Sequence, residues 1–326
     1  MSVSRQLTFM GAVNEAMKLE MRRDPSIFLM GEDVGIGDGT FGASQGLVKE
    51  FGIERVRDTP LSEAGFIGAG VGAALTGLRP IVELMFVDFL GVCFDQVLNQ
   101  AAKLRYMSGG RLKVPLVVRT NWGGGLNAAS QHSQSLYSIV THIPGLKVVV
   151  PSTPYDAKGL LISALRQDDP IFFFEQKALF DYKGEVPEGS YTIPVGKAEI
   201  KRRGKDATIV AIGRMVYLAM EAATALEAEG KSIEVIDARS LSPLDEETIL
   251  SSIKKTGRLI VVDEAHPRCS IASDIGALAA VKALEYLNAP VRLVTGGHSP
   301  VPFSPALESA YLPSTDRIVQ AVREIT

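Results

Sequence analysis

The stretch GFIGAGVGAALTGLRPIVELMF, residues 65–86, shows the unit from which the fold is built. Its first half, which is rich in small residues, predicts a helix over residues 65–76. Gly77 then predicts a turn, and residues 80–86 predict a buried strand. Similar apolar strands alternate with helical segments on both sides of this stretch, which indicates a parallel sheet covered by helices on both faces.

A segment without periodicity interrupts this alternation at residues 176–195, where turn-forming residues predict a linker. Four further strand–helix steps follow it. We therefore predict an α/β protein with two parallel-sheet domains. Their predicted bounds are residues 1–185 and 201–326, with residues 186–200 as the linker and first strand region.

Composition excludes several classes of protein. The net charge of −3 supplies no basic field, so nucleic acid is not an expected partner. No apolar run reaches the ~18 residues of a membrane span, and the N-terminus lacks the pattern of a signal peptide. Cys93 and Cys269 lack metal-ligand spacing and are expected to be buried thiols. These features predict a cytoplasmic protein.

The helix predicted at residues 65–76 carries few large side chains. Each glycine in a helix costs about 1 kcal/mol relative to alanine, so close packing must offset the loss. We expect a second subunit to approach this helix; tight packing inside one domain is the alternative.

Glu63 precedes this helix and has two interpretations. Ser62 at the N-cap position with Glu63 in the first turn is a common stabilising arrangement. A carboxylate beside an apolar, glycine-lined wall also suits proton exchange with the ring of a ligand. Spacing alone favours the first interpretation.

Two loops are candidates for ligand binding, because ligands bind at the strand ends of parallel sheets. His132 lies in the glycine-rich loop GGGLNAASQHSQS, although a single histidine is weak evidence. The segment GIGDGTFG at residues 35–42 is interpreted as a turn, because it lacks the lysine of a phosphate-binding loop. His142, His266 and His298 are interpreted as structural or loop residues.

Taken together, the motifs resemble a known family over roughly residues 7–320. In order, the strings that carry the resemblance are GEDVG, DTPLSEAGFIG, GLRPIVELMFVDF, FDQVLNQAAKLRYMSGG, QHSQS, IPGLKVVVPSTPYDAKGLL and DARSLSPLD. They are similar to the β subunits of thiamine-diphosphate-dependent 2-oxo acid and acetoin dehydrogenases, which are transketolase-like. The resemblance implies a pyrimidine-binding domain followed by a transketolase C-terminal domain.

It also implies an α2β2 heterotetramer with a cofactor site at each α/β junction. In this family the α subunit holds the diphosphate and magnesium through a GDG motif and a later pair of asparagines. This chain has Gly37-Asp38-Gly39 without that asparagine pair, which agrees with a β subunit.

The family's cofactor residues fall on five positions. The resemblance implies that Glu63 hydrogen-bonds the aminopyrimidine ring nitrogen and so activates the cofactor. Leu61 would offer its backbone to the same ring, while Phe89 and Met85 would line the pocket. Glu32 would lie near the cofactor and help to link the two active sites.

His132 would face the reacting carbon and the lipoyl entrance, with Gln131 orienting it. Many family members also hold a structural potassium ion near the end of a helix. The corresponding residues here are Ala164, Leu165, Gln167 and Asp169. Some relatives have Asp and Asn where this chain has Gln167 and Asp169, so this chain departs from the usual pattern.

Further strings, including AASQHSQSLYSI and DEAHPRCSIASDI, resemble the acetoin-cleaving members. The resemblance implies cleavage of acetoin to acetaldehyde and transfer of the hydroxyethyl/acetyl unit to the lipoyl groups of a dihydrolipoamide acyltransferase. The alternatives are a pyruvate or branched-chain 2-oxo acid dehydrogenase β subunit, and a subunit that mainly docks the acyltransferase core.

Overall fold

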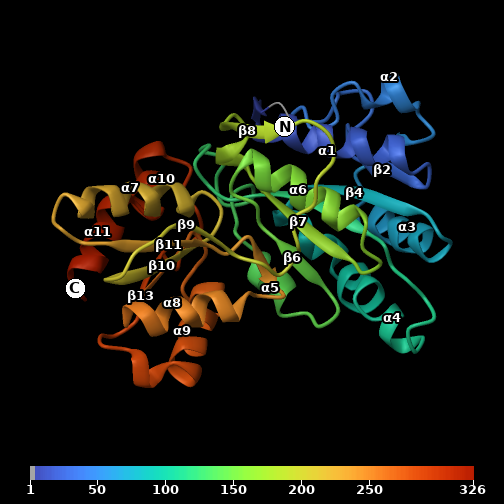
Figure 1. Ribbon diagram of the computed structural model, residues 1–326. Helices are drawn as coiled ribbons and strands as arrows, with labels where there is room; N and C mark the ends of the chain where they lie inside the picture. The colour runs from blue at the N-terminus through green and yellow to red at the C-terminus, as the bar shows by residue number, and fades with distance from the viewer. Residues whose placement is uncertain (1–3) are drawn as a thin grey trace. The chain divides into compact units, whose positions relative to one another are not determined.

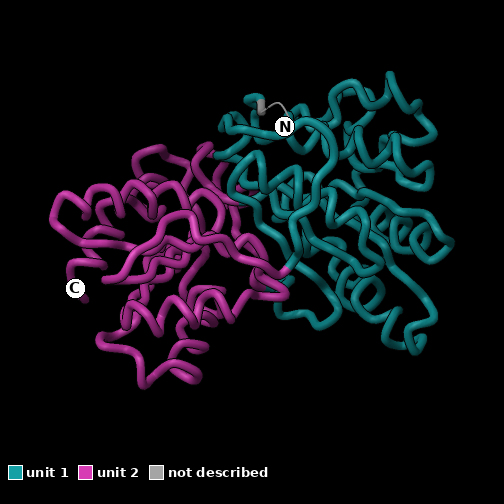
Figure 2. Tube along the Cα trace, viewed as in Figure 1, with its two compact units in different colours: residues 1–122, 139–195 teal, residues 123–138, 196–326 magenta. Residues whose placement is uncertain are grey.

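A computed structural model describes residues 4–326, which form two compact units. The first unit contains the chain up to residue 122 and residues 139–195, and the second contains residues 123–138 and 196–326 (Figure 2). The sequence had predicted a single transition at residues 186–200. Residues 123–138, which include His132, are grouped instead with the second unit.

The first unit is built on a parallel sheet, as its apolar strands predict (Figure 1). Its strands are β2 (Ile27–Gly31), β3 (Val56–Asp58), β4 (Arg79–Phe86), β5 (Val117–Trp122), β6 (Lys147–Val149) and β7 (Ile171–Gln176). They lie in the order β6-β7-β5-β4-β2-β3. Every residue of β5 and β7 is buried, as expected for central strands of a sheet covered on both faces. Outside this sheet, β1 (Ser4–Thr8) pairs antiparallel with β8 (Lys183–Pro187).

The helices of this unit begin at recognisable caps. Thr8 caps α1 (Phe9–Arg23) by accepting a hydrogen bond from the Gly11 amide. Thr153 caps α6 (Pro154–Leu165) in the same way, and α6 packs against α1. Other helices are α2 (Leu47–Phe51), α3 (Glu63–Leu75), α4 (Leu104–Met107) and the 3₁₀ turn η3 (Lys177–Leu179), while α5 (Tyr137–Thr141) begins in residues of the second unit.

The small-residue helix α3 has two different faces. A Cβ atom at Gly70 would lie 2.6 Å from Val82 Cγ2, so this glycine allows α3 to pack closely on β4. Gly65, Ala69 and Gly72 are exposed on the helix. Packing within the first unit therefore explains the small residues on the buried face of α3. That a second subunit approaches the exposed face remains a prediction.

The string DFLGVCFDQVLNQAAKLRYMSGG, residues 88–110, predicts one long helix closed by Gly109 and Gly110, and this prediction was wrong. Residues 88–110 do not form one long helix but a 3₁₀ segment η1 (Val87–Cys93), a π-helical segment η2 (Gln96–Ala101) and the short α4. The spacing of apolar residues does not distinguish these helix types, because their periods differ little over one or two turns. Gly109 and Gly110 do end the segment, both with positive φ.

The second unit has a mixed sheet in the order β14-β13-β10-β11-β9. Its strands are β9 (Glu199–Arg202), β10 (Ala207–Ala211), β11 (Ile233–Asp237), β13 (Leu259–Asp263) and β14 (Arg292–Thr295), with the short β12 (Ser240–Ser242) elsewhere in the unit. Four of these strands are parallel, as predicted, but β9 runs antiparallel to β11 at the edge.

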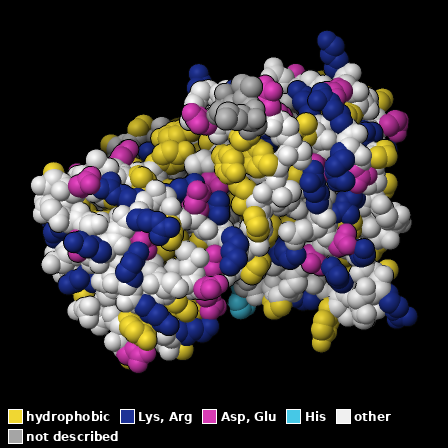
Figure 3. Space-filling view, in the orientation of Figure 1, with side chains coloured by type: hydrophobic (Ala, Val, Ile, Leu, Met, Phe, Trp, Pro, Cys, Tyr) yellow, Lys and Arg dark blue, Asp and Glu magenta, His cyan; other side chains and the backbone are white. Residues whose placement is uncertain are grey.

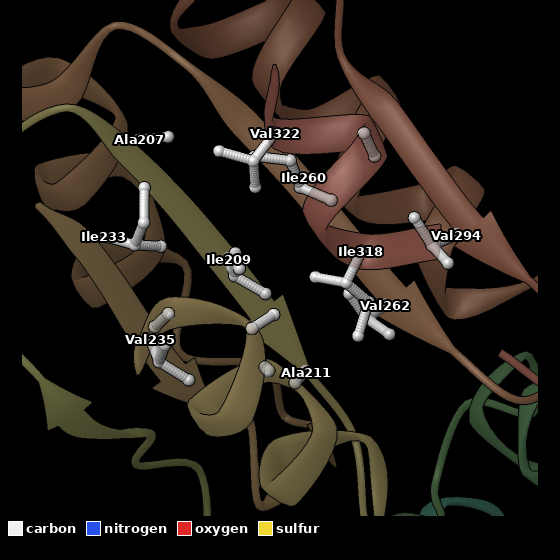
Figure 4. Packing of buried hydrophobic residues seen from close by; sticks show 14 of the residues in the cluster. Ala207, Ile209, Ala211, Ile233, Val235, Ile260, Val262, Val294, Ile318 and Val322 are labelled. Carbon is white, nitrogen blue, oxygen red and sulfur yellow. The ribbon is translucent and has the colours of Figure 1, made fainter. Parts of the chain in front are cut away.

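The core of this unit joins the sheet to its helices. Ile209, Val235 and Val262 pack with Ile318 and Val322 of the C-terminal helix (Figure 4). The helices are α7 (Met215–Glu227), α8 (Glu246–Thr256), α9 (Ile271–Lys282), the 3₁₀ turn η4 (Leu284–Tyr286), α10 (Pro305–Tyr311) and α11 (Thr315–Arg323).

On the face drawn in Figure 3, acidic side chains lie among the Lys and Arg side chains. No helix of the described residues has the length and apolar character needed to cross a bilayer.

A buried ion triad crosses the first sheet. Arg119 on β5 is 1% exposed and donates to Glu83 on β4 at 2.8 Å. Its other nitrogens donate to both oxygens of Glu175 on β7, at 2.6 and 2.7 Å. Burial lowers the pKa of Arg119, but the two carboxylates outweigh this effect and raise it. The triad therefore joins three neighbouring strands through charge-assisted bonds.

We expect Arg119→Met to lower the free energy of unfolding by about 3–5 kcal/mol, because it leaves two buried carboxylates unpaired. Urea unfolding monitored by circular dichroism measures the loss. The control is Arg22→Met, which removes a surface ion pair with Glu50 worth about 0–1 kcal/mol. Equal effects of the two substitutions would show that the triad contributes little.

Candidate active site

Glu63 is the first residue of α3, where the positive end of the helix dipole favours a carboxylate. Ser62 occupies the N-cap position, but its side chain makes no capping hydrogen bond. The interpretation of Glu63 as a first-turn residue therefore agrees with its position, but Ser62 does not cap the helix through its side chain. Glu63 is half-buried, and its charge acts on the buried Glu32 and Cys93.

Glu32 follows the end of β2 and is 6% exposed. Its Oε1 atom is buried without a hydrogen-bond partner. Burial raises the pKa of this carboxyl, and the negative charges of Glu63, Asp33 and Glu83 raise it further. The structure thus brings together the two predicted carboxylates, one of which has an unused acceptor available to a ligand.

Met85 lies at an irregularity in the sheet. The register between β4 and β5 shifts between Leu84 and Phe86, so Met85 sits in a bulge. Its carbonyl oxygen accepts from Asn121 Nδ2 at 2.8 Å, and its sulfur accepts from Thr40 Oγ1 at 3.5 Å. Bulges of this kind often redirect a side chain beside an active site.

Phe89 lies on η1, immediately after β4, with its ring 6.1 Å from that of Phe86. Because α3 packs against both β4 and η1, the elements carrying Glu63, Met85 and Phe89 are neighbours. Leu61, on the loop before α3, is 83% exposed, which leaves its backbone accessible.

This group of residues fits one end of the expected cofactor. Carboxylates beside sulfur and aromatic side chains suit an aminopyrimidine ring, which has hydrogen-bonding edges and apolar faces. The charged end does not fit. Asp38, in the turn predicted at residues 35–42, accepts through Oδ1 from the Gly46 amide beyond that turn, and within residues 4–326 no cluster of three or more His, Cys, Asp or Glu suits a metal ion.

His132 is half-buried in the second unit, within a loop held by carboxylates. Glu264 accepts from the Gly124 amide, and Glu308 accepts from the Asn127 amide at 3.0 Å. At the end of the loop the Tyr137 hydroxyl donates to the buried Asp263. Sequence reasoning missed these three carboxylates; their only signal was acidic residues at the end of an apolar strand and on a late helix.

The other histidines and the cysteines have local roles. His266 Nδ1 lies 2.8 Å from the Gly297 carbonyl oxygen, and its ring centroid is 5.6 Å from that of His298. Burial raises the pKa of Cys93 to about 12, as expected for an unreactive thiol. Cys269 is exposed, so its predicted burial was wrong.

The residues considered for potassium gather at the end of α6. The carbonyl oxygens of Ala164 and Leu165, and the side chains of Gln167 and Asp169, all lie on or next to the turn that leads into β7. Each of these groups already accepts a hydrogen bond or ion pair from elsewhere in the unit.

Comparison with known proteins matches the chain to two family models. Residues 5–182 match the family model "Transketolase, pyrimidine binding domain", and residues 196–318 match "Transketolase, C-terminal domain". A solved structure titled split gene transketolase, inactive beta4 tetramer, covers 100% of this chain and 98% of its own, with a TM-score of 0.80. At 22% identity, that likeness shows the fold.

Two curated relatives from Bacillus subtilis (strain 168) are more similar in sequence. The β subunit of acetoin:2,6-dichlorophenolindophenol oxidoreductase is 56% identical, over 99% of this chain and 98% of the relative. The β subunit of the pyruvate dehydrogenase E1 component is 44% identical, over 98% of each chain.

The raised pKa of Glu32 predicts a pH effect on stability. A carboxyl whose pKa is higher in the folded state stabilises the fold while it is protonated, and this contribution is lost as pH rises through the folded pKa. Glu32→Gln stays neutral, so its melting temperature relative to wild type should increase from pH 5 to pH 8. A difference that does not change with pH, like that expected for the exposed Glu54→Gln, would contradict the assignment.

Proposed function

This chain belongs to the transketolase-like β subunits of the thiamine-diphosphate-dependent 2-oxo acid and acetoin dehydrogenases, and from that premise we propose that it serves an enzyme that cleaves acetoin. As a β subunit it is an oxidoreductase component. The observation that carries the proposal is the difference between 56% identity to an acetoin enzyme and 44% identity to a pyruvate enzyme of the same organism, at nearly equal coverage.

The proposed reaction cleaves acetoin to acetaldehyde and passes the remaining acetyl unit to a lipoyl group of an acyltransferase. Thiamine diphosphate, when bound, supplies the electron sink that such a cleavage beside a carbonyl requires. Glu63 would hydrogen-bond the ring nitrogen of the pyrimidine and share a proton with it. Glu32 would offer its unused oxygen nearby. Met85 and Phe89 would exclude water from the apolar side of the ring.

The partner in this proposal is an α subunit, in an α2β2 assembly. Glu32, Asp33 and Glu63 give this chain an acidic wall, which repels an anionic diphosphate. The α subunit would therefore hold the diphosphate with magnesium. His132 would act during acyl transfer to the lipoyl arm. With two free cysteines and no disulfide to form, a cytoplasmic setting stays our prediction.

Two alternatives make different predictions. A pyruvate or branched-chain 2-oxo acid β subunit would share the same fold and cofactor residues, so only substrate turnover separates it from an acetoin enzyme. A subunit that mainly docks the acyltransferase would not require the Glu63 carboxylate.

The substrate is tested in the enzyme reconstituted with its α subunit. We expect kcat/KM for acetoin to exceed that for pyruvate by at least about tenfold, which corresponds to ~1.4 kcal/mol of differential transition-state binding. Acetaldehyde release and dye reduction measure turnover of acetoin, and carbon dioxide release measures turnover of pyruvate. If acetoin yields no acetaldehyde while pyruvate is consumed, the 2-oxo acid alternative is correct.

Glu63→Gln in the same reconstituted enzyme should lower kcat by about 10²–10⁴-fold, because the amide keeps the shape but cannot take up a proton. Steady-state turnover gives the rate, and analytical ultracentrifugation checks that the heterotetramer still forms. The matched control is Glu247→Gln, whose side chain is 86% exposed in the second unit. Near-normal turnover of the Glu63 variant would support the docking alternative.

A further inference from the structure

The turn between α6 and β7 is tied to the chain's own cations through its backbone oxygens. The Leu165 carbonyl oxygen accepts from Arg79 Nε at 3.0 Å, and the Gln167 carbonyl oxygen accepts from Arg79 Nη2. The Ala164 carbonyl oxygen accepts from the Gln167 amide at 3.2 Å. The carbonyls that would have to coordinate a potassium ion are therefore already engaged.

The side chains of the turn are also paired with cationic side chains of the chain itself. Asp169 pairs with Arg105 through Oδ1 and with Lys147 through Oδ2, the latter at 3.0 Å. Lys147 also donates to the Gln167 side-chain oxygen. Partial burial alone would raise the pKa of Asp169, but Lys147 and Arg105 together lower it.

The neighbouring Asp168 completes the cluster. It pairs with Lys113 at 2.7 Å and with Arg79 at 3.3 Å. The cluster thus contains four cationic side chains and two carboxylates, which leaves two positive charges unbalanced. A further cation would be repelled by these charges and would have to displace hydrogen bonds that are already formed.

We propose that Arg79, Arg105 and Lys147 together form a built-in cationic clamp that replaces the structural potassium ion at this turn. The residues present do not fit the ion, although the resemblance implied it. The clamp would make the fold of the first unit independent of potassium. This inference holds whichever substrate the enzyme cleaves.

The clamp acts where several strands start. The Val114 amide donates to the Asp168 carbonyl oxygen at 3.0 Å, and the Lys147 amide donates to the Pro170 carbonyl oxygen at 3.1 Å. The turn therefore connects the starts of β6 and β7 with the segment before β5. Arg79, the first residue of β4, ties a further strand to the same point.

The first experiment locates the cation directly. Crystals of the reconstituted α2β2 enzyme are soaked in a thallium(I) salt, because thallium(I) substitutes for potassium and scatters anomalously. We expect no anomalous peak within coordination distance of the Leu165 and Gln167 carbonyl oxygens. A peak at that position would overturn the proposal, whereas peaks in the α subunit do not bear on this turn.

The second experiment uses Arg105→Met in the same assembly. We expect an apparent melting temperature about 2–4 °C below wild type, because Asp169 loses one of its two cations and the pair is partly exposed. Potassium chloride should restore part of this loss relative to choline chloride at equal ionic strength. Wild type should melt at the same temperature in both salts. If it does not, the difference between the two salts should persist in Asp169→Asn, which would place its cause outside this turn.

The matched control is Arg111→Met, which removes an exposed guanidinium from the same segment; its Nε donates to the Ser108 carbonyl oxygen at 3.0 Å. A melting temperature of Arg105→Met equal to that of this control would overturn the clamp. An Arg105 variant that does not fold, beside a control that does, would support it, and the thallium measurement on wild type remains decisive in that case.

Discussion

The first unit depends on the ion triad that the buried guanidinium of Arg119 forms with two carboxylates. The bonds of Arg119 to Glu83 and Glu175 hold β4, β5 and β7 together at the centre of the sheet. β4 then continues into the bulge at Met85 and the segment that carries Phe89. A charge buried this deeply is costly unless both carboxylates stay in place, so the sheet that supports the candidate site has little freedom to slip.

The same triad shapes the electrostatics of the site. Glu83 is one of the charges that raise the pKa of Glu32, while Arg119 keeps Glu83 paired. Glu63 lies near enough to Glu32 for its charge to raise that pKa as well. In the proposed function, these carboxylates would favour a neutral or protonated ring and repel phosphate, so an α subunit would hold the diphosphate.

Local patterns predicted most of this fold, and long-range contacts account for what they missed. The helix predicted at residues 65–76 is α3, Glu63–Leu75, because its small residues and the following Gly77 are local signals. Arg119 stood in the apolar string VPLVVRT without a visible partner, since Glu83 and Glu175 lie on other strands. Likewise, nothing near His132 in the sequence indicated that Glu264 and Glu308 would hold its loop.

The turn after α6 shows how a family pattern and a structure can disagree. The oxygens of Leu165, Gln167 and Asp169 gather at one turn, as a cation site requires, but the cations come from Arg79, Arg105 and Lys147, far away in sequence. A potassium ion can be exchanged and depends on its concentration. Side-chain cations are covalently attached, so the turn does not depend on a particular dissolved cation, at the cost of ordering three long side chains. The two solutions satisfy the same carbonyls and carboxylates, which is why sequence motifs around the turn alone cannot separate them.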